Sequence, residues 1–423
     1  MHRAAEFEGL KSERRRAMVK RVFLMTGLAG LAASTVLLAT VGSARAQTLP
    51  ASDRPAGLVI YPKIVSDPSA IFTLGSGPRT DTLIRLTNVS AASVTAECFY
   101  VDGTSHCSIG INSFDPVTGA CRTNSDCDEG GTCVPASCQT GIPDFPLTLT
   151  PNQTVGWVVS TGGTLPESAG TVPPAPTLFF IGELKCIEGT FTSGGAFEAL
   201  NANDLVGGAT IETVTSGSPG SVDAREYSAI GLAAVSAPAA PGSTGQTLCL
   251  GETPGSTECT VANYANCPST LILDHFFDYA AAASDTTGVS LQTDLTLVPC
   301  SESPEGGGTV PRTAVQFLVY NEFEQRFSTS MAFSCFNEIE LSQIDTRPGQ
   351  EQYSIFNENV QGTLSGQTKI RPVPGSETEI GHGLLGVAEQ FFTYNLNGAT
   401  GSAAWNLNYL GANGTQGDFL RIP

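Results

Sequence analysis

The chain has 423 residues, and its 21 Lys and Arg against 40 Asp and Glu give a formal charge of −19 at neutral pH. This charge excludes nucleic acid and anionic membrane surfaces as partners, because both repel an acidic protein. The length allows two or three domains, each with a hydrophobic core of its own.

The N-terminal segment, residues 1–46, has the organisation of an export signal peptide. A basic stretch precedes the uncharged apolar run Val22–Val41, and Ala44-Arg45-Ala46 is an A-x-A cleavage site, so the mature chain is expected to begin at Gln47. A membrane-spanning anchor is the alternative for a run of this length, but the many small residues and the cleavage site favour removal. Arg15-Arg16 opens a stretch that resembles a twin-arginine export motif, and a Sec signal is the alternative.

The mature part is more acidic than the whole chain. Removing the signal takes away eight basic and three acidic residues, which leaves 13 against 37 and a charge of −24. Its lysines are Lys63, Lys185 and Lys369. All 12 cysteines lie in this part, and an even count in an exported chain predicts disulfides and an extracellular or periplasmic location.

The most informative stretch is Pro311–Phe336, which reads as two strands rich in aromatic and β-branched residues around a polar turn. A weaker copy lies at Pro78–Phe99. Both copies open with Pro-Arg-Thr, place an Asn nine residues after the Arg (Asn88 and Asn321), and end in Cys-Phe. The ordered matches predict two related β domains, each with this hairpin.

Other strands are expected along the whole mature chain. They are predicted in chain order at Gly57–Val65, Pro146–Ser160, Leu178–Ile187, Leu205–Val214, Tyr227–Val235, Leu271–Tyr279 (a strand or a short helix), Leu291–Cys300, Gln390–Leu396 and Ala404–Leu410. The composition changes twice. Residues 103–143 form a Cys-rich insertion with few apolar side chains, and 236–267 form a connector rich in Pro, Gly, Ala and Ser. The expected domains are therefore 47–235, containing the insertion, and 268–423.

Many short strands, abundant Gly and Pro, and little helical periodicity predict an all-β chain of two antiparallel β-sandwiches. The segment Leu149–Thr154, Leu-x-Pro-x-Gln-Thr, resembles immunoglobulin-like domains of bacterial exported proteins, and this resemblance implies two immunoglobulin-like sandwiches. The usual Cys–Trp–Cys arrangement is missing, because Trp157 lies well after Cys98. The chain as a whole resembles uncharacterised secreted bacterial proteins, a resemblance that implies no activity.

Four disulfides are predicted. Cys300 is assigned to Cys335 because both end predicted strands and no cysteine after Cys267 competes, and Cys98 is assigned to Cys186. The run from Cys121 to Cys138 resembles small disulfide-knotted repeats of secreted proteins, with Cys121 bonded to Cys133 and Cys127 to Cys138. The partners of Cys107, Cys249, Cys259 and Cys267 are left open.

Few residues have the pattern of a catalytic site. The mature histidines are His106, His275 and His382, and neither an HExxH nor a G-x-S-x-G motif occurs. Asp274, His275 and Asp278 are the closest to a catalytic cluster, since a carboxylate can orient a histidine as a general base. On a strand, however, Asp274 and His275 point to opposite faces, so a satisfied core histidine is the favoured interpretation.

Asp126, Asp128 and Glu129 are the candidate metal site. They lie in the Cys-rich insertion beside two glycines, and calcium prefers hard oxygen ligands from such loops. The spacing is not that of an EF-hand, and solvated acidic side chains are the favoured alternative. No cofactor other than calcium is expected.

These features favour an exported, soluble, non-enzymatic protein with a structural or adhesive role. It would bind a protein or a glycan, or associate with itself, through loops or edge strands, without a membrane anchor after signal cleavage. The alternatives are a secreted hydrolase of unrecognised type, using the cluster around His275, and a calcium-stabilised extracellular filament subunit.

Overall fold

The chain divides into two compact units, Met1–Gln47 and Thr48–Pro423, and all the described residues lie in the second. The computed structural model describes residues 50–67, 79–108, 127, 131–134, 144–162, 173–176, 179–195, 197–214, 222–234, 248–251, 262–265, 267–279, 289–300, 312–347, 349–373, 383–394, 400–410 and 419–421. In these ranges no helix is long and apolar enough to cross a membrane.

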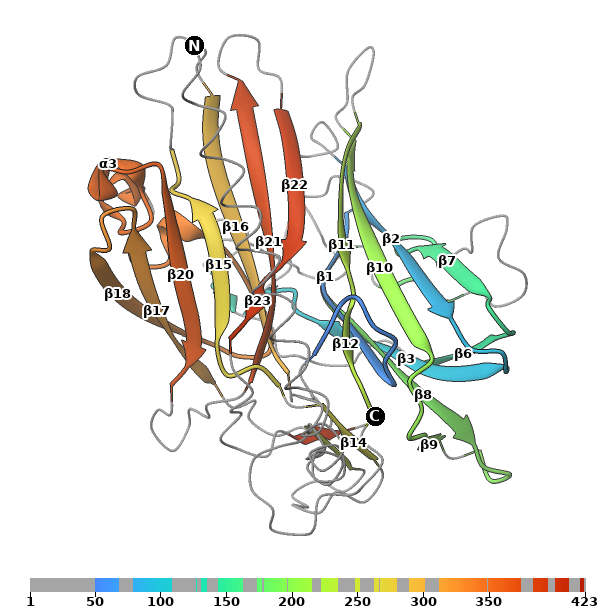
Figure 1. The fold of residues 1–423 in the computed structure, drawn as a ribbon. Helices are drawn as coiled ribbons and strands as arrows, with labels where there is room; N and C mark the ends of the chain where they lie inside the picture. The colour runs from blue at the N-terminus through green and yellow to red at the C-terminus, as the bar shows by residue number, and fades with distance from the viewer. Residues whose placement is uncertain are drawn as a thin grey trace, which may run out of the picture. The chain divides into compact units, whose positions relative to one another are not determined.

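Two antiparallel sheets are built from the N-terminal half (Figure 1). Sheet I has the order β12-β1-β8-β3-β6, with β9 beside β8, and sheet II has the order β11-β10-β2-β7. Their strands are β1 (Leu58–Ser66), β2 (Arg79–Asn88), β3 (Val94–Asp102), β6 (Phe145–Leu149), β7 (Thr154–Val158), β8 (Phe180–Phe191), β9 (Phe197–Ala199), β10 (Leu205–Val214), β11 (Val222–Ser228) and β12 (Ile230–Leu232). The short pair β4 (His106–Cys107) and β5 (Cys133–Val134) lies in the predicted insertion.

Two further sheets come from the C-terminal half. Sheet III has the order β18-β17-β20-β15-β23, and sheet IV has the order β19-β16-β21-β22. Their strands are β15 (Leu271–Phe276), β16 (Val289–Pro299), β17 (Thr313–Asn321), β18 (Arg326–Phe333), β19 (Asn337–Glu340), β20 (Ser365–Pro372), β21 (Leu384–Tyr394), β22 (Thr400–Asn406) and β23 (Asn408–Tyr409). A small sheet joins β13 (Leu248–Gly251), β14 (Ala262–Tyr264) and β24 (Phe419–Arg421), and the helical turns are η4 (Leu341–Gln343), η5 (Glu351–Tyr353) and α3 (Glu358–Gln361).

The all-β class is as predicted, but the prediction of two immunoglobulin-like sandwiches is wrong. Sheets I to IV are arranged as four blades in a ring, in the manner of a small β-propeller. A sheet of a two-sheet sandwich has one buried face and one solvated face, whereas β1 of sheet I is buried at all nine positions. Sheet I therefore has a neighbour on each face, which a separate sandwich does not provide.

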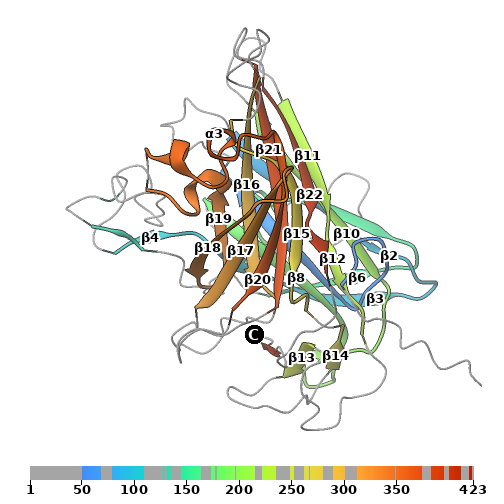
Figure 2. The same cartoon turned by 60° about the vertical axis from the view of Figure 1, so that its left-hand side comes forward.

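Alternate side chains of β1 pack against the two sheets that flank sheet I. Val59 and Tyr61 belong to a core shared with sheet II, and Leu58 and Ile60 belong to a second core shared with Val298 and Leu385 of sheet IV. A third core joins sheets III and IV. Strand β11 of sheet II also runs beside β22 of sheet IV (Figures 1 and 2), where the Asn406 amide donates to the Ser228 carbonyl over 2.7 Å. The continuous burial of β1 follows from this stacking.

The repeated stretch is a hairpin in one copy only. β17 pairs with β18 across the predicted turn, but β2 and β3 lie in different sheets, so the hairpin predicted at Pro78–Phe99 is wrong. The repeated asparagines nonetheless have the same role. Asn88 and Asn321 are both buried, and each side-chain oxygen accepts from the backbone two residues later, at Ser90 and Phe323, which fixes the turn after β2 or β17.

The predicted pair Cys98–Cys186 is confirmed; the two residues face each other in the register of β3 and β8. The pair Cys300–Cys335 is wrong, because Cys300 is bonded to Cys267. Backbone bonds explain this choice. The Cys300 N–H donates to the Gly383 carbonyl, and the N–H of Leu384 donates to the Pro268 carbonyl. Pro268, and with it Cys267, is thereby held beside the end of β16.

The pair Cys127–Cys138 is also wrong, because Cys127 is bonded to Cys107 across 5.5 Å between Cα atoms. Both cysteines lie inside the insertion, so this bond closes a loop within it, beside the short pair of β4 and β5. Cys133 and Cys335 are disulfide-bonded too. The pair Cys121–Cys133 stays a prediction.

Candidate functional site

An open depression of about 600 Å³ lies at an edge of sheet III. β15 pairs with β23 only at Leu271 and Ile272, so in the described part of the chain its later residues have no strand on that side. The side chains that line the depression include Asp274, His275, Tyr320, Glu322, Gln390 and Trp405. The walls therefore come from sheet III and from β21 and β22 of sheet IV.

His275 is a satisfied core residue on the wall of this depression. Its side chain is 5% exposed and its Nδ1 lies 3.0 Å from the Phe276 carbonyl oxygen. Because a carbonyl only accepts, Nδ1 carries the proton, and Nε2 accepts from the Thr368 hydroxyl at 2.9 Å. Burial lowers the pKa of His275 to about 4, so the ring is neutral at neutral pH and both nitrogens are occupied.

Asp278 has a structural role that the sequence did not indicate. Its two carboxylate oxygens accept from the backbone N–H groups of Thr293 and Ser342, over 2.8 and 2.9 Å. It is fully buried, and this burial raises its pKa to about 8. Asp278 thus joins the end of β15 to β16 and η4, and it does not line the depression with His275.

Asp274 is exposed on β15, with its carboxylate 3.3 Å from the Gln367 amide. It lies on the face of β15 opposite His275, as strand alternation predicts. The structure therefore brings Asp274 and His275 to one depression without joining them. The metal candidates Asp126, Asp128 and Glu129 lie outside the described residues, and within the described ranges no cluster of metal-ligating side chains occurs.

Exposed apolar side chains gather at the end of sheet III next to the depression. Thirteen large hydrophobic side chains are exposed among the described residues, and six of them lie on the segments that meet here. We call these six the apolar end of sheet III: Phe276 (44% exposed), Tyr279 (39%), Phe323 (70%), Tyr353 (69%), Val360 (40%) and Leu364 (49%). Aromatic side chains of this kind are enriched at protein interfaces.

The segments that carry these side chains are held together by hydrogen bonds. The Phe277 N–H donates to the Leu364 carbonyl and the Asp278 N–H to the Phe356 carbonyl, both over 2.9 Å. Glu322 in the β17–β18 turn accepts from the Ser365 N–H and hydroxyl, at 3.0 and 2.8 Å. The exposed side chains are therefore presented by fixed loops, which reduces the ordering cost of binding.

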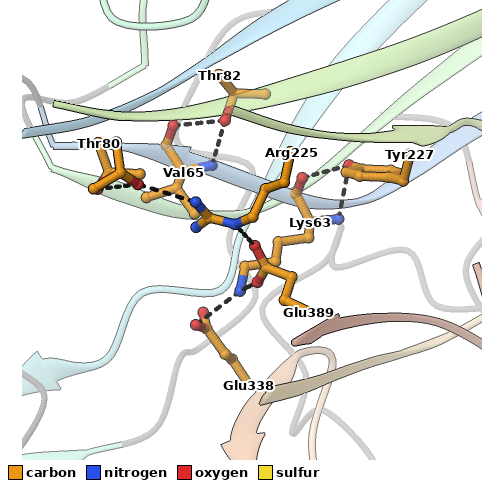
Figure 3. A network of polar contacts seen from close by, with 9 residues as sticks. Lys63, Val65, Thr80, Thr82, Arg225, Tyr227, Glu338 and Glu389 are labelled. Atoms are coloured by element: carbon orange, nitrogen blue, oxygen red, sulfur yellow. Dashed lines mark hydrogen bonds and ion pairs between the residues drawn. The ribbon is translucent and has the colours of Figure 1, made fainter. Parts of the chain in front are cut away.

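A buried network of charges lies where sheets I, II and IV meet (Figure 3). Glu389 of β21 is 1% exposed and forms ion pairs with Lys63 of β1 and Arg225 of β11. The Lys63 ammonium also contacts Glu338 of β19 at 2.9 Å, and the Tyr227 hydroxyl donates to the Lys63 carbonyl. Burial raises the pKa of neighbouring Asp294 to about 6. Because every charged partner comes from a different strand, the network connects three of the four sheets.

Sheet I holds a second buried pair, Lys185 with Glu183, at 2.8 Å and almost unexposed. Two of the three lysines in residues 48–423 are therefore buried. The sequence contains a signal for both: each lies inside an apolar run, IYPKIV and IGELKCI, where a lysine needs a buried acid. The acids themselves lie far away in the sequence and have no motif.

No family model matches the chain, and the comparison with curated proteins found no match. The interpretation of function therefore depends on the geometry alone.

Proposed function

We propose that the protein is an exported, non-enzymatic binding protein with a structural or adhesive role, and that it acts through the apolar end of sheet III. The observation that carries this proposal is the gathering of six exposed apolar side chains on hydrogen-bonded loops. Isolated exposed apolar residues are normal, but six of the thirteen exposed here lie on loops that hydrogen bonds join at one end of sheet III.

The disulfides support export, since such bonds persist in oxidising compartments. We propose the periplasm or the cell exterior as the location. The acidic surface supports a protein or glycan partner over nucleic acid, because phosphate backbones repel a negative protein.

One observation favours the alternative of a hydrolase: the depression is lined by His275 together with Asp274 and Glu322. Three facts weigh against it. The site is an open depression, the His275 nitrogens are both engaged, and Asp278 binds backbone amides elsewhere. A general base needs a free lone pair within reach of the proton that it abstracts.

The test is binding of the purified mature chain to cell envelopes of the bacterium that encodes it, measured by co-sedimentation. We expect wild-type binding to saturate and the triple variant Phe323→Ser, Tyr353→Ser, Leu364→Ser to bind at least tenfold more weakly. The matched control is Val222→Ser on sheet II, where the side chain is 63% exposed, and it should bind as wild type does. No saturable binding by wild type, or equal binding by the triple variant, would refute the proposal.

A further inference from the structure

The depression beside β15 has both apolar and polar surface. It is open to solvent, and its lining combines aromatic side chains with carboxylates and amides, with more apolar than polar surface. Drug-like molecules bury most of their surface in an enclosed pocket, so a small apolar ligand does not suit an open depression. A ligand with many hydroxyl groups and some apolar C–H surface does.

The polar groups of the lining are held in place before any ligand arrives. Glu322 uses one carboxylate oxygen, Oε1, for both bonds to Ser365, and Asp274 uses Oδ1 for Gln367. The second oxygen of each carboxylate has no partner among the described residues. Each can accept a hydroxyl hydrogen without a change of side-chain conformation, and hydrogen bonds to charged groups are the stronger ones.

The aromatic groups supply the complementary surface. Phe276 is exposed, Tyr320 and Trp405 are half-buried, and all three line the depression. The face of an aromatic ring is electron-rich, and the C–H groups on one side of a sugar ring carry the opposite partial charge. Stacking of a sugar ring on such a face therefore satisfies apolar and polar needs together.

The local charge disfavours an anionic ligand. Among the described residues, the lining holds the acids Asp274 and Glu322 and neither a lysine nor an arginine. Lys369, whose ammonium lies 5.5 Å from the centre of the Tyr320 ring, and Arg326, the register partner of Tyr320, are the nearest bases and weaken the attraction for a cation. An acidic polysaccharide is therefore disfavoured, and a neutral glycan suits the aromatic side chains of the lining better than a basic peptide does.

From this juxtaposition we propose that the depression at the edge of β15 binds a neutral glycan, with Trp405 and Tyr320 stacking on sugar rings and Asp274, Glu322 and Gln367 binding hydroxyl groups. This rests on the proposed function, because it names the ligand class of a site adjoining the apolar end of sheet III.

The experiment uses the mature chain and a panel of neutral hexasaccharides: chitohexaose, cellohexaose, maltohexaose and mannohexaose. Trp405 is one of two tryptophans and the other, Trp157, is buried in the core, so a change of tryptophan fluorescence reports on the depression. We expect a saturable change with at least one neutral hexasaccharide. Calorimetry should show at least tenfold weaker binding for Asp274→Asn and for Gln367→Leu, which keep the size of the side chains, and for Trp405→Ala.

The controls are hexalysine and heparin. No response to any neutral hexasaccharide, equal affinity in the three variants, or a response to hexalysine or heparin alone would overturn the proposal. Failure of this proposal is separable from failure of the proposed function. If the Phe323, Tyr353 and Leu364 variant loses envelope binding while Asp274→Asn and Gln367→Leu keep it, the adhesive surface stands without the glycan site. Glycan binding without envelope binding would mean that the glycan site stands without the adhesive surface.

Discussion

Replacing Lys63 by Met should lower the free energy of unfolding by about 3–5 kcal/mol, the range for removing one partner of a buried ion pair. Lys63 is 2% exposed and contacts both Glu389 and Glu338. Methionine fills a similar volume, so the loss comes mainly from charge. Glu389 keeps Arg225 as its partner, but Glu338 loses the ammonium at 2.9 Å and sheet IV loses its ionic link to β1.

Urea unfolding monitored by circular dichroism measures this effect. With a denaturant dependence of about 3 kcal/mol per molar urea, the midpoint should fall by about 1 M or more. The matched control is Lys369→Met, where the lysine is half-buried and lies over the Tyr320 ring, an interaction of about 0.5–1 kcal/mol. If Lys63→Met lowers the free energy of unfolding by less than about 1 kcal/mol, or by no more than Lys369→Met does, the reasoning that the network joins the sheets is refuted.

Three further predictions follow from the same buried groups. An amine-reactive reagent should modify Lys369 in the native protein and Lys63 and Lys185 only after denaturation, because both are buried; peptide mass spectrometry would show the difference. Non-reducing peptide mapping should recover Cys267 with Cys300, and a Cys300–Cys335 peptide would contradict the structure. Burial raises the pKa of Asp294 from 3.8 to about 6, so the folded state binds this proton more tightly than the unfolded state, and ionisation costs stability as the pH rises through this window. Urea titrations should therefore show that Asp294→Asn gains stability relative to wild type as the pH rises from 4 to 6. A difference in the free energy of unfolding that does not change with pH would contradict the assignment.

Strand positions were predictable because they depend on local alternation. β17 alternates buried and half-buried residues along its whole length, and β10 has the predicted bounds Leu205–Val214. Strand partners were not predictable in the same way. Asn88 gives β2 a turn like that after β17, but nothing local determines that β3 enters sheet I while β2 stays in sheet II. That choice depends on long-range pairing with β8 and β10.

The disulfides show the same contrast between local patterns, which the sequence reveals, and long-range pairing, which it does not. Cys98 and Cys186 lie within strands that the pattern identified, and they face each other in register. Cys300 was assigned by elimination along the sequence, but its partner is set by where Pro268 and Gly383 meet in space. The apolar end of sheet III could not be predicted from the sequence for another reason. Phe323 lies in a turn that its polar neighbours identify as solvent-exposed, and only the fold brings the adjacent Glu322 into contact with Ser365, next to Leu364.

The buried charges bear on the arrangement of the four sheets. An apolar interface between sheets I and IV would tolerate sliding of one sheet over the other, because hydrophobic contact is non-directional. A carboxylate shared by Lys63 and Arg225 is satisfied only in one position, and a shift would leave a buried charge unpaired at a cost of several kcal/mol. Core residues such as Leu58 and Leu385 therefore provide the attraction between the sheets, while the ion pairs select one register among the apolar alternatives. Replacing Lys63, Arg225 and Glu389 together by apolar residues would test this division, because the cohesion should survive while the single register should not.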